Sequence, residues 1–137
     1  MKSLVVDDDI TCSYIFQTQL SRYGHCDTVT NGWDAIEAYK SSLNKNDPYH
    51  LIIIDIMMPD MNGYEVLKNI RAIEAERQIR FPFNAKIILA TGLDDIENRQ
   101  LEEKLDELSE AYLVKSNDLN ALINKLNLLG FDLSEFV

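Results

Sequence analysis

The chain has 137 residues and a formal net charge of −10 at pH 7, with 46% hydrophobic and 26% charged residues. This length and composition fit one soluble domain with a full core, and the length is too short for two domains of ordinary size. The apolar runs are far shorter than the roughly 20 residues of a membrane span, and the acidic charge opposes contact with nucleic acid or anionic lipid. Because MKSLVV meets Asp7 before a signal-peptide core could form, we expect a cytoplasmic protein.

Five short apolar runs alternate with five segments of helical periodicity, which predicts a regular alternation of strands and helices. The first strand is expected at Ser3 to Val6, followed by three aspartates. Asp9 can cap the next helix, and Gly24 can end it. The apolar face expected on that helix is made of Cys12, Ile15, Phe16, Leu20 and Tyr23.

The middle of the chain contains the most strongly apolar run. A weaker strand is expected from His25 to Thr30, and Asn31-Gly32 then leads into a helix. Leu51 to Ile54 has no polar alternation, which is typical of a strand buried on both faces of a parallel sheet, and it runs directly into Asp55. After the turn residues that follow, a helix is expected. The inward residues predicted on the two helices are Ile36, Tyr39 and Leu43, and then Tyr64, Val66, Leu67, Ile70 and Ile73.

In the second half we expect a loop from Glu74 to Asn84, because Pro82 disfavours a helix there. A strand from Lys86 to Ala90 then stops at Thr91-Gly92. The segment from Asp94 to Glu110 is predicted to form a charged helix with a narrow apolar stripe. Ala111 to Val114 is predicted to form a strand that ends at Lys115. The last helix is expected to bury Leu119, Leu122, Ile123 and Leu126.

The predicted strand ends bring reactive side chains together. Parallel strands end at one edge of a sheet, which is where open α/β sheets bind ligands. That edge would hold Asp7 to Asp9, Asp55, Thr91 and Lys115. Clustered carboxylates favour a hard divalent cation such as Mg²⁺, while a hydroxyl and an ammonium suit the oxygens of a phosphoryl group. Asp55 would then be the nucleophile that takes the phosphoryl group.

Four segments, LVVDDD, LIIIDIMMPDMNG, IILATG and AYLVK, occur in the order and spacing of the receiver domain of two-component response regulators. The chain closely resembles that family along almost its whole length, and in particular its stand-alone, chemotaxis-regulator-like members. The resemblance implies a flavodoxin-like (βα)5 fold, a doubly wound parallel sheet with strand order 2-1-3-4-5. Residues 1–129 would form the receiver domain, and 130–137 a tail too short to be an output domain.

The resemblance also implies a metal-dependent phosphoacceptor. Asp55 would accept a phosphoryl group from a sensor histidine kinase or a phosphotransfer protein. Asp8, Asp55 and the backbone carbonyl of Met57 would hold Mg²⁺, or Mn²⁺ in its place, with Asp7 supporting the site through water. Self-catalysed phosphorylation and dephosphorylation would occur without turnover of a separate substrate.

Further positions are implied to transmit the signal. Thr91 and Lys115 would contact the phosphoryl oxygens, and Tyr112 matches an aromatic switch position. The surface that changes would lie around the fourth helix, fifth strand and fifth helix, and would bind a downstream protein target. Met57 and Leu93 match positions that tune the phosphoryl lifetime; both are apolar and cannot orient water, so slow autodephosphorylation is expected.

The chain departs from the family at Ser116, where a proline in a cis peptide usually follows the lysine. A cis bond to a residue other than proline costs about 2.5–4 kcal/mol, so the Lys115-Ser116 bond is either strained or trans. This departure leaves open a pseudo-receiver that docks partners without being phosphorylated.

An enzymatic alternative is also open. LVVDDDIT satisfies the D-x-D-x-T pattern of haloacid dehalogenase-like phosphatases, with Asp7 as nucleophile and Asp9 as acid/base. In that interpretation Thr91 and Lys115 would supply the hydroxyl and the lysine of later motifs. Asp55 and its PDMNG turn would then have no role, which favours the receiver.

Overall fold

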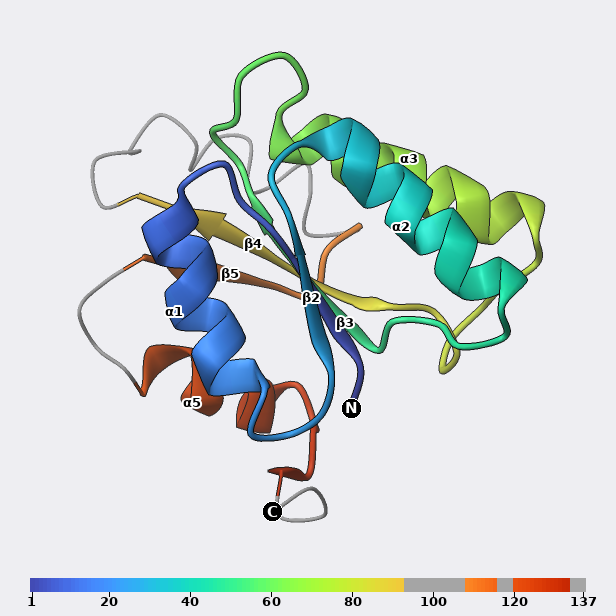
Figure 1. Ribbon diagram of the computed structural model, residues 1–137. Helices are drawn as coiled ribbons and strands as arrows, with labels where there is room; N and C mark the ends of the chain where they lie inside the picture. The colour runs from blue at the N-terminus through green and yellow to red at the C-terminus, as the bar shows by residue number, and fades with distance from the viewer. Residues whose placement is uncertain (93–107, 116–119, 134–137) are drawn as a thin grey trace.

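A computed structural model describes residues 1–92, 108–115 and 120–133 (Figure 1). Its elements follow in strict alternation over the first half of the chain. They are β1 Ser3–Val6, α1 Ile10–Leu20, β2 Cys26–Val29, α2 Gly32–Asn44, β3 Leu51–Asp55, α3 Gly63–Glu76, β4 Lys86–Thr91, β5 Ala111–Val114 and α5 Ala121–Leu128. Most of the charged helix expected from Asp94 falls outside the described residues, as do Leu93, Ser116 and Leu119.

The strands form one parallel sheet in the order β2-β1-β3-β4-β5, which confirms the predicted topology. β3 and β4 are each one residue longer than predicted. The ladder pairs Asp55 with Ala90, and Thr91 with Val114, so both extra residues are held in the sheet. The register therefore fixes the phosphoacceptor candidate and the threonine at neighbouring strand ends.

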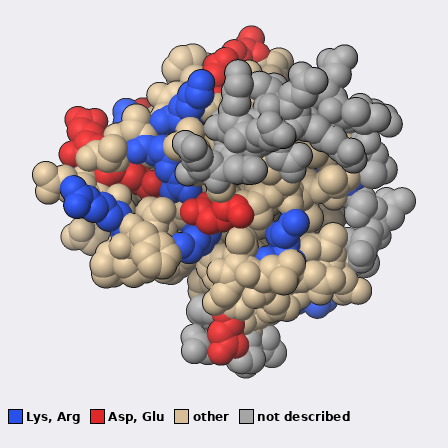
Figure 2. Space-filling model, turned by 180° about the vertical axis from the view of Figure 1, so that it is seen from behind, with Lys and Arg blue, Asp and Glu red and all other residues tan. Residues whose placement is uncertain are grey.

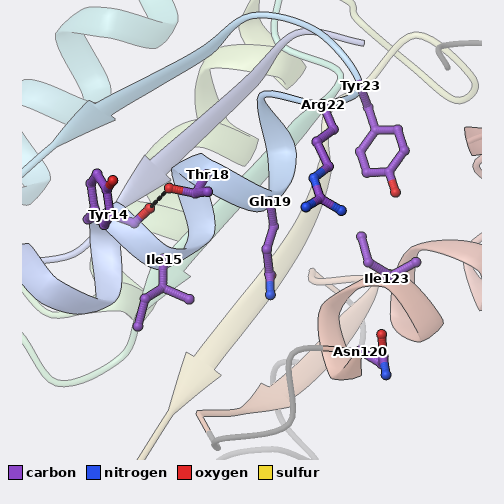
Figure 3. A pocket seen from close by; sticks show the side chains of 8 residues that line it. All are labelled: Tyr14, Ile15, Thr18, Gln19, Arg22, Tyr23, Asn120 and Ile123. Atoms are coloured by element: carbon purple, nitrogen blue, oxygen red, sulfur yellow. Dashed lines mark hydrogen bonds between the residues drawn. The ribbon is translucent and has the colours of Figure 1, made fainter.

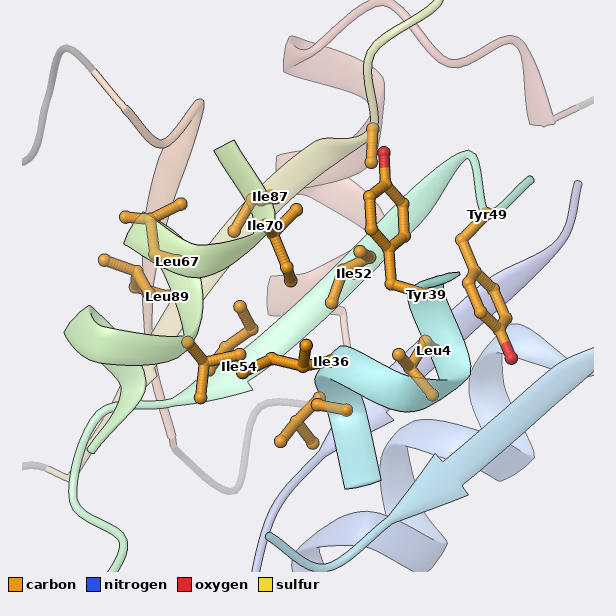
Figure 4. Close-up of a cluster of buried hydrophobic side chains, with 14 of the residues drawn as sticks. Leu4, Ile36, Tyr39, Tyr49, Ile52, Ile54, Leu67, Ile70, Ile87 and Leu89 are labelled. Carbon is orange, nitrogen blue, oxygen red and sulfur yellow. The ribbon is translucent and has the colours of Figure 1, made fainter. Parts of the chain in front are cut away.

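Both faces of the sheet are covered, as the lack of polar alternation in β3 predicts. Ile52 and Ile54 point into a cluster under α2 and α3 (Figure 4), whereas Leu51 and Ile53 point into a second cluster with α1 and α5. Figure 1 shows the two helix pairs on opposite sides of the strands. Leu133 is buried in the second cluster, so the segment after α5 contributes to the core.

Three details differ from the sequence prediction. Ile15 is 43% exposed, because α1 turns Ser13, Phe16 and Leu20 toward the sheet instead. α1 ends at Leu20, before Gly24. The loop expected from Glu74 begins later, since α3 continues through Glu76.

Helix starts follow the predicted turn chemistry. The Asp9 carboxylate accepts the backbone N–H of Thr11 at 2.9 Å and caps α1. Asn62 does the same for α3, accepting the Glu65 N–H at 3.0 Å. These caps fix the turns that leave the carboxyl edge of the sheet.

Gly63 packs directly beneath the candidate phosphoacceptor. A Cβ there would lie 2.5 Å from the Asp55 carbonyl oxygen and 2.8 Å from Ile56 Cα, and neither backbone atom can move away easily. We expect Gly63→Ala to lower the free energy of unfolding by about 1–3 kcal/mol, the usual cost of overpacking. No atom of the described residues would lie within 4 Å of a Cβ at Gly92, so Gly92→Ala should change it by less than about 0.5 kcal/mol. Urea unfolding of both variants checks this, and equal losses would contradict it.

Candidate phosphoacceptor site

The residues predicted at the carboxyl edge do converge there. Asp7 follows β1, Asp55 and Thr91 are the last residues of β3 and β4, and Lys115 follows β5. Asp7 and Asp55 are only 1% and 5% exposed. The Lys115 ammonium lies 2.8 Å from Asp7 Oδ2 and 3.4 Å from Asp55 Oδ1, so one lysine bridges two buried carboxylates.

The aspartates also form a cluster suited to a cation. One carboxylate oxygen each from Asp7, Asp8 and Asp55 lies within 4.8 Å of the others. Asp8 is exposed, while its two partners are buried. An all-oxygen donor set that is open to solvent on one side fits Mg²⁺, which keeps several of its waters. The residues present therefore fit a hard divalent ion.

Backbone groups orient two of these carboxylates. The Asp9 N–H donates to Asp7 Oδ1 at 2.9 Å, and the Met57 N–H donates to Asp55 Oδ1 at 3.2 Å. Each carboxylate therefore has one oxygen fixed by the turn that follows its own strand. The placement of the Met57 carbonyl toward a metal remains a prediction.

The charges at this edge oppose and compensate one another. Burial and the nearby Asp7 charge raise the pKa of Asp55 to about 7, against the opposing effects of Lys115 and the Met57 N–H. Burial works against the charge of Lys115, but its bond to Asp7 and the charge of Asp55 raise the pKa of the ammonium overall. The lysine therefore stays charged where Asp55 titrates.

This shift predicts a pH dependence of stability. Because the folded state raises the pKa of Asp55 from 3.8 to about 7, it binds more protons than the unfolded chain within that window. The contribution of Asp55 to the free energy of unfolding is therefore fully present below about pH 4 and is lost as the pH rises through about 7. Urea unfolding without Mg²⁺ at several pH values measures it as the difference between wild type and Asp55→Asn. Parallel pH profiles for the two proteins would contradict the shift.

Thr91 ends β4 beside this cluster, and Tyr112 lies on the neighbouring strand β5. Thr91 is buried, and its hydroxyl lies 3.5 Å from the Gly92 carbonyl oxygen. Tyr112 is half-buried, and its hydroxyl lies 3.4 Å from that of Tyr64 on α3. Sequence reasoning placed Tyr64 only in the core, so this pairing of the predicted switch residue was missed.

The comparisons with known proteins agree on one family. The family model for the response regulator receiver domain matches residues 3–127. Two-component response regulator 24 of Arabidopsis thaliana is 33% identical over 129 residues, covering 93% of this chain and 84% of that protein. The chain belongs to the response regulator receiver domain family.

One further relative is a longer protein, and one is a solved structure with the same fold. The CpxR homolog of Haemophilus influenzae, a transcriptional regulatory protein, is 30% identical over 138 residues, which cover 96% of this chain but 58% of that protein. The receiver domain of the histidine kinase CKI1 from Arabidopsis thaliana, complexed with Mg²⁺, superposes with a TM-score of 0.77 at 25% identity. That match covers 93% of this chain and 90% of that one.

The receiver assignment agrees with the local geometry of the acidic triplet. In the phosphatase alternative Asp9 would be an acid/base, but its carboxylate caps α1 through Thr11 and Cys12. Asp7 would be the nucleophile, but both of its oxygens are held, one by the Asp9 N–H and one by Lys115. The geometry therefore gives the phosphatase alternative no support.

Exposed apolar side chains lie around this receiver site, and sequence reasoning assigned none of these side chains a role in partner binding. Ile10 and Tyr14 on α1, Trp33 at the start of α2 and Met57 after β3 are all largely exposed. Such residues stand out only once the fold shows which of them are left uncovered. Next to them, α1 and α5 enclose a groove of about 400 Å³ (Figure 3). Its lining includes Tyr14, Ile15, Arg22 and Ile123.

Among the described residues, no helix combines the length and apolar character that crossing a membrane requires.

Proposed function

We propose that this receiver domain is a phosphoryl-accepting switch of a two-component phosphorelay. Asp55 takes a phosphoryl group from a phosphohistidine, and the protein then presents a changed surface to a downstream protein. The observation that carries this proposal is the meeting of Asp55, two further aspartates and Lys115 at one sheet edge. We assign the switch to residues 1–129, followed by a short tail, 130–137, whose Leu133 packs into the core.

The residues have distinct tasks in this transfer. The ionised Asp55 oxygen attacks phosphorus in line, the bond from phosphorus to the imidazole nitrogen breaks, and an acyl phosphate forms. Lys115 and Thr91 are placed to contact the phosphoryl oxygens. A bound Mg²⁺ would neutralise charge on those oxygens, held by Asp8, Asp55 and the Met57 carbonyl with Asp7 behind them. Mn²⁺ has the same ligand preference and would substitute.

The phosphodonor must bring an imidazole to the open side of Asp55. The exposed Ile10, Tyr14, Trp33 and Met57 lie around that approach, and protein interfaces are enriched in aromatic side chains and methionine. They support docking of a histidine kinase or phosphotransfer protein rather than a small ligand alone. The downstream target would bind around β5 and α5, where Tyr112 links the site to the surface.

The proposal is tested by incubating the purified chain with Mg²⁺ and acetyl phosphate. We expect a mass increase of one phosphoryl group that requires the metal and is removed by hydroxylamine, as an acyl phosphate is. Absence of labelling together with absence of Mg²⁺ binding would contradict the proposal and favour the pseudo-receiver.

The phosphoryl lifetime gives a separate prediction. The Met57 side chain is exposed beside Asp55 and is apolar, so it cannot orient an attacking water. We expect slow loss of the phosphoryl group, and Met57→Asn should accelerate it severalfold by supplying an amide; Leu93→Glu tests the second position. Met57→Leu is the matched control and should keep the slow rate. Loss within seconds that none of these changes alters would contradict the prediction.

A further inference from the structure

The connection between α3 and β4 exposes two large aromatic side chains at the end of the sheet away from Asp55. Phe81 and Phe83 are 78% and 81% exposed. The loop is nevertheless ordered by its own contacts. The Phe83 N–H donates to the Arg80 carbonyl at 2.8 Å, and the Lys86 ammonium lies 4.6 Å from the centre of the Phe81 ring. A partner would therefore meet a loop with a fixed turn and a Phe81 ring held by Lys86.

The same loop carries a local charge opposite to that of the chain. Residues 77–86 contain Arg77, Arg80 and Lys86 and no carboxylate, in a chain whose net charge is −10. Of the acidic side chains nearby, Glu74 and Glu110 are paired with Arg71, and Glu76 at the end of α3 is exposed. Figure 2 shows Lys and Arg side chains on the α3 side of the molecule, with Asp and Glu side chains among them. A basic loop of this kind attracts a negatively charged partner.

A cavity lined in part by Arg80 and Asn84, which flank the aromatic segment in sequence, indicates what kind of partner fits. This cavity of about 340 Å³ lies against the loop, with Gln78, Arg80 and Asn84 in its lining. Side-chain amides can pair with the N–H and C=O groups of a peptide, whereas an acyl chain would leave them without hydrogen bonds.

We propose that this surface, made of residues 77–86 and the adjoining cavity, binds an acidic peptide segment of a partner protein that also carries apolar side chains. The apolar side chains would cover Phe81 and Phe83, and the carboxylates would meet Arg80 and Arg77. The surface lies at the opposite end of β3 and β4 from Asp55, so binding there would leave the phosphoacceptor accessible. This inference goes beyond the proposed switch and does not depend on it.

The test uses fluorescence anisotropy with a short labelled peptide that alternates Glu with Leu and Phe. We expect saturable binding that weakens at high salt and that becomes at least tenfold weaker in Phe81→Ser/Phe83→Ser and in Arg80→Glu. Matched controls are Leu128→Ser, an equally exposed apolar residue on α5, and Lys45→Glu at the end of α2. Both controls should bind like wild type.

Other outcomes would overturn the proposal. The proposal fails if the acidic peptide does not bind saturably, or if a peptide with Lys in place of Glu binds equally well. It also fails if the loop variants lose no more peptide affinity than the controls. Co-sedimentation with phosphatidylserine vesicles that requires the two Phe side chains would assign the loop to a membrane instead. A dimer in analytical ultracentrifugation that the double variant abolishes would assign it to a second copy. Labelling by acetyl phosphate should persist in the double variant, which shows that it is folded and keeps this test separate from the switch.

Discussion

Asp55→Asn is expected to abolish labelling by acetyl phosphate, reducing it at least a hundredfold while leaving the fold intact. The amide keeps the shape of the side chain but has no anionic oxygen to attack phosphorus. It also removes one of the three carboxylates that could hold the metal. Labelling is measured by intact-protein mass spectrometry after incubation with Mg²⁺. Removing the repulsion between Asp55 and Asp7 should make the variant at least as stable as wild type near neutral pH.

Two further aspartate variants make this result specific. Asp60→Asn changes an exposed loop carboxylate five residues away and should be labelled like wild type. Asp7→Asn should be labelled more slowly but at the same residue, because Asp7 only supports the site. Label retained in Asp55→Asn and lost in Asp7→Asn would contradict the assignment and restore the phosphatase alternative.

Arg71→Met is expected to destabilise the protein by about 3–5 kcal/mol, the usual cost of removing one partner from a buried ion pair. The Arg71 guanidinium donates to the carbonyls of Leu108 at 2.7 Å and Ala85 at 2.9 Å. It also pairs with Glu74 at 2.6 Å and with both oxygens of Glu110, at 2.9 and 3.1 Å. Its side chain is 14% exposed and that of Glu74 only 4%, so the variant would leave buried carboxylates uncompensated.

Arg77→Met is the matched control, because it changes the same residue type at the C-terminal cap of the same helix. Arg77 is exposed and donates to Asn44 Oδ1 at 2.9 Å, so we expect a loss below about 1 kcal/mol. Both free energies come from urea unfolding. If the two variants lose similar free energies of unfolding, the contacts of Arg71 do not hold α3 to β4 and β5.

The strands and the phosphoacceptor could be predicted from sequence because their signals are local. Leu51 to Ile54 is apolar without alternation and ends in a carboxylate, and the parallel sheet then brings other strand ends to the same edge. The resemblance to receiver domains supplied the strand order, whereas the end of the fifth predicted strand had already put Lys115 at this edge. Its two ion pairs, with Asp7 and Asp55, agree with that position.

The features that were missed depend on partners distant in sequence. Glu74 was expected in a loop, yet it lies in α3, accepting the Tyr39 hydroxyl at 2.6 Å and the Ala85 N–H at 2.8 Å. Helical periodicity cannot reveal such a partner on α2. Ile15 fits the apolar stripe of α1, but only the position of the helix on the sheet decides that Phe16 is covered and Ile15 is not.

The central claim is that Asp55 takes the phosphoryl group while Lys115, which now bridges Asp7 and Asp55, turns to that group's oxygens. A crystal structure with Mg²⁺ and beryllofluoride tests it most directly. We predict beryllium on an Asp55 oxygen, Mg²⁺ held by Asp8 and Asp55, and the Lys115 ammonium within hydrogen-bond distance of a fluorine. Beryllofluoride on Asp7, or an empty site with Lys115 still bridging the two aspartates, would contradict the account.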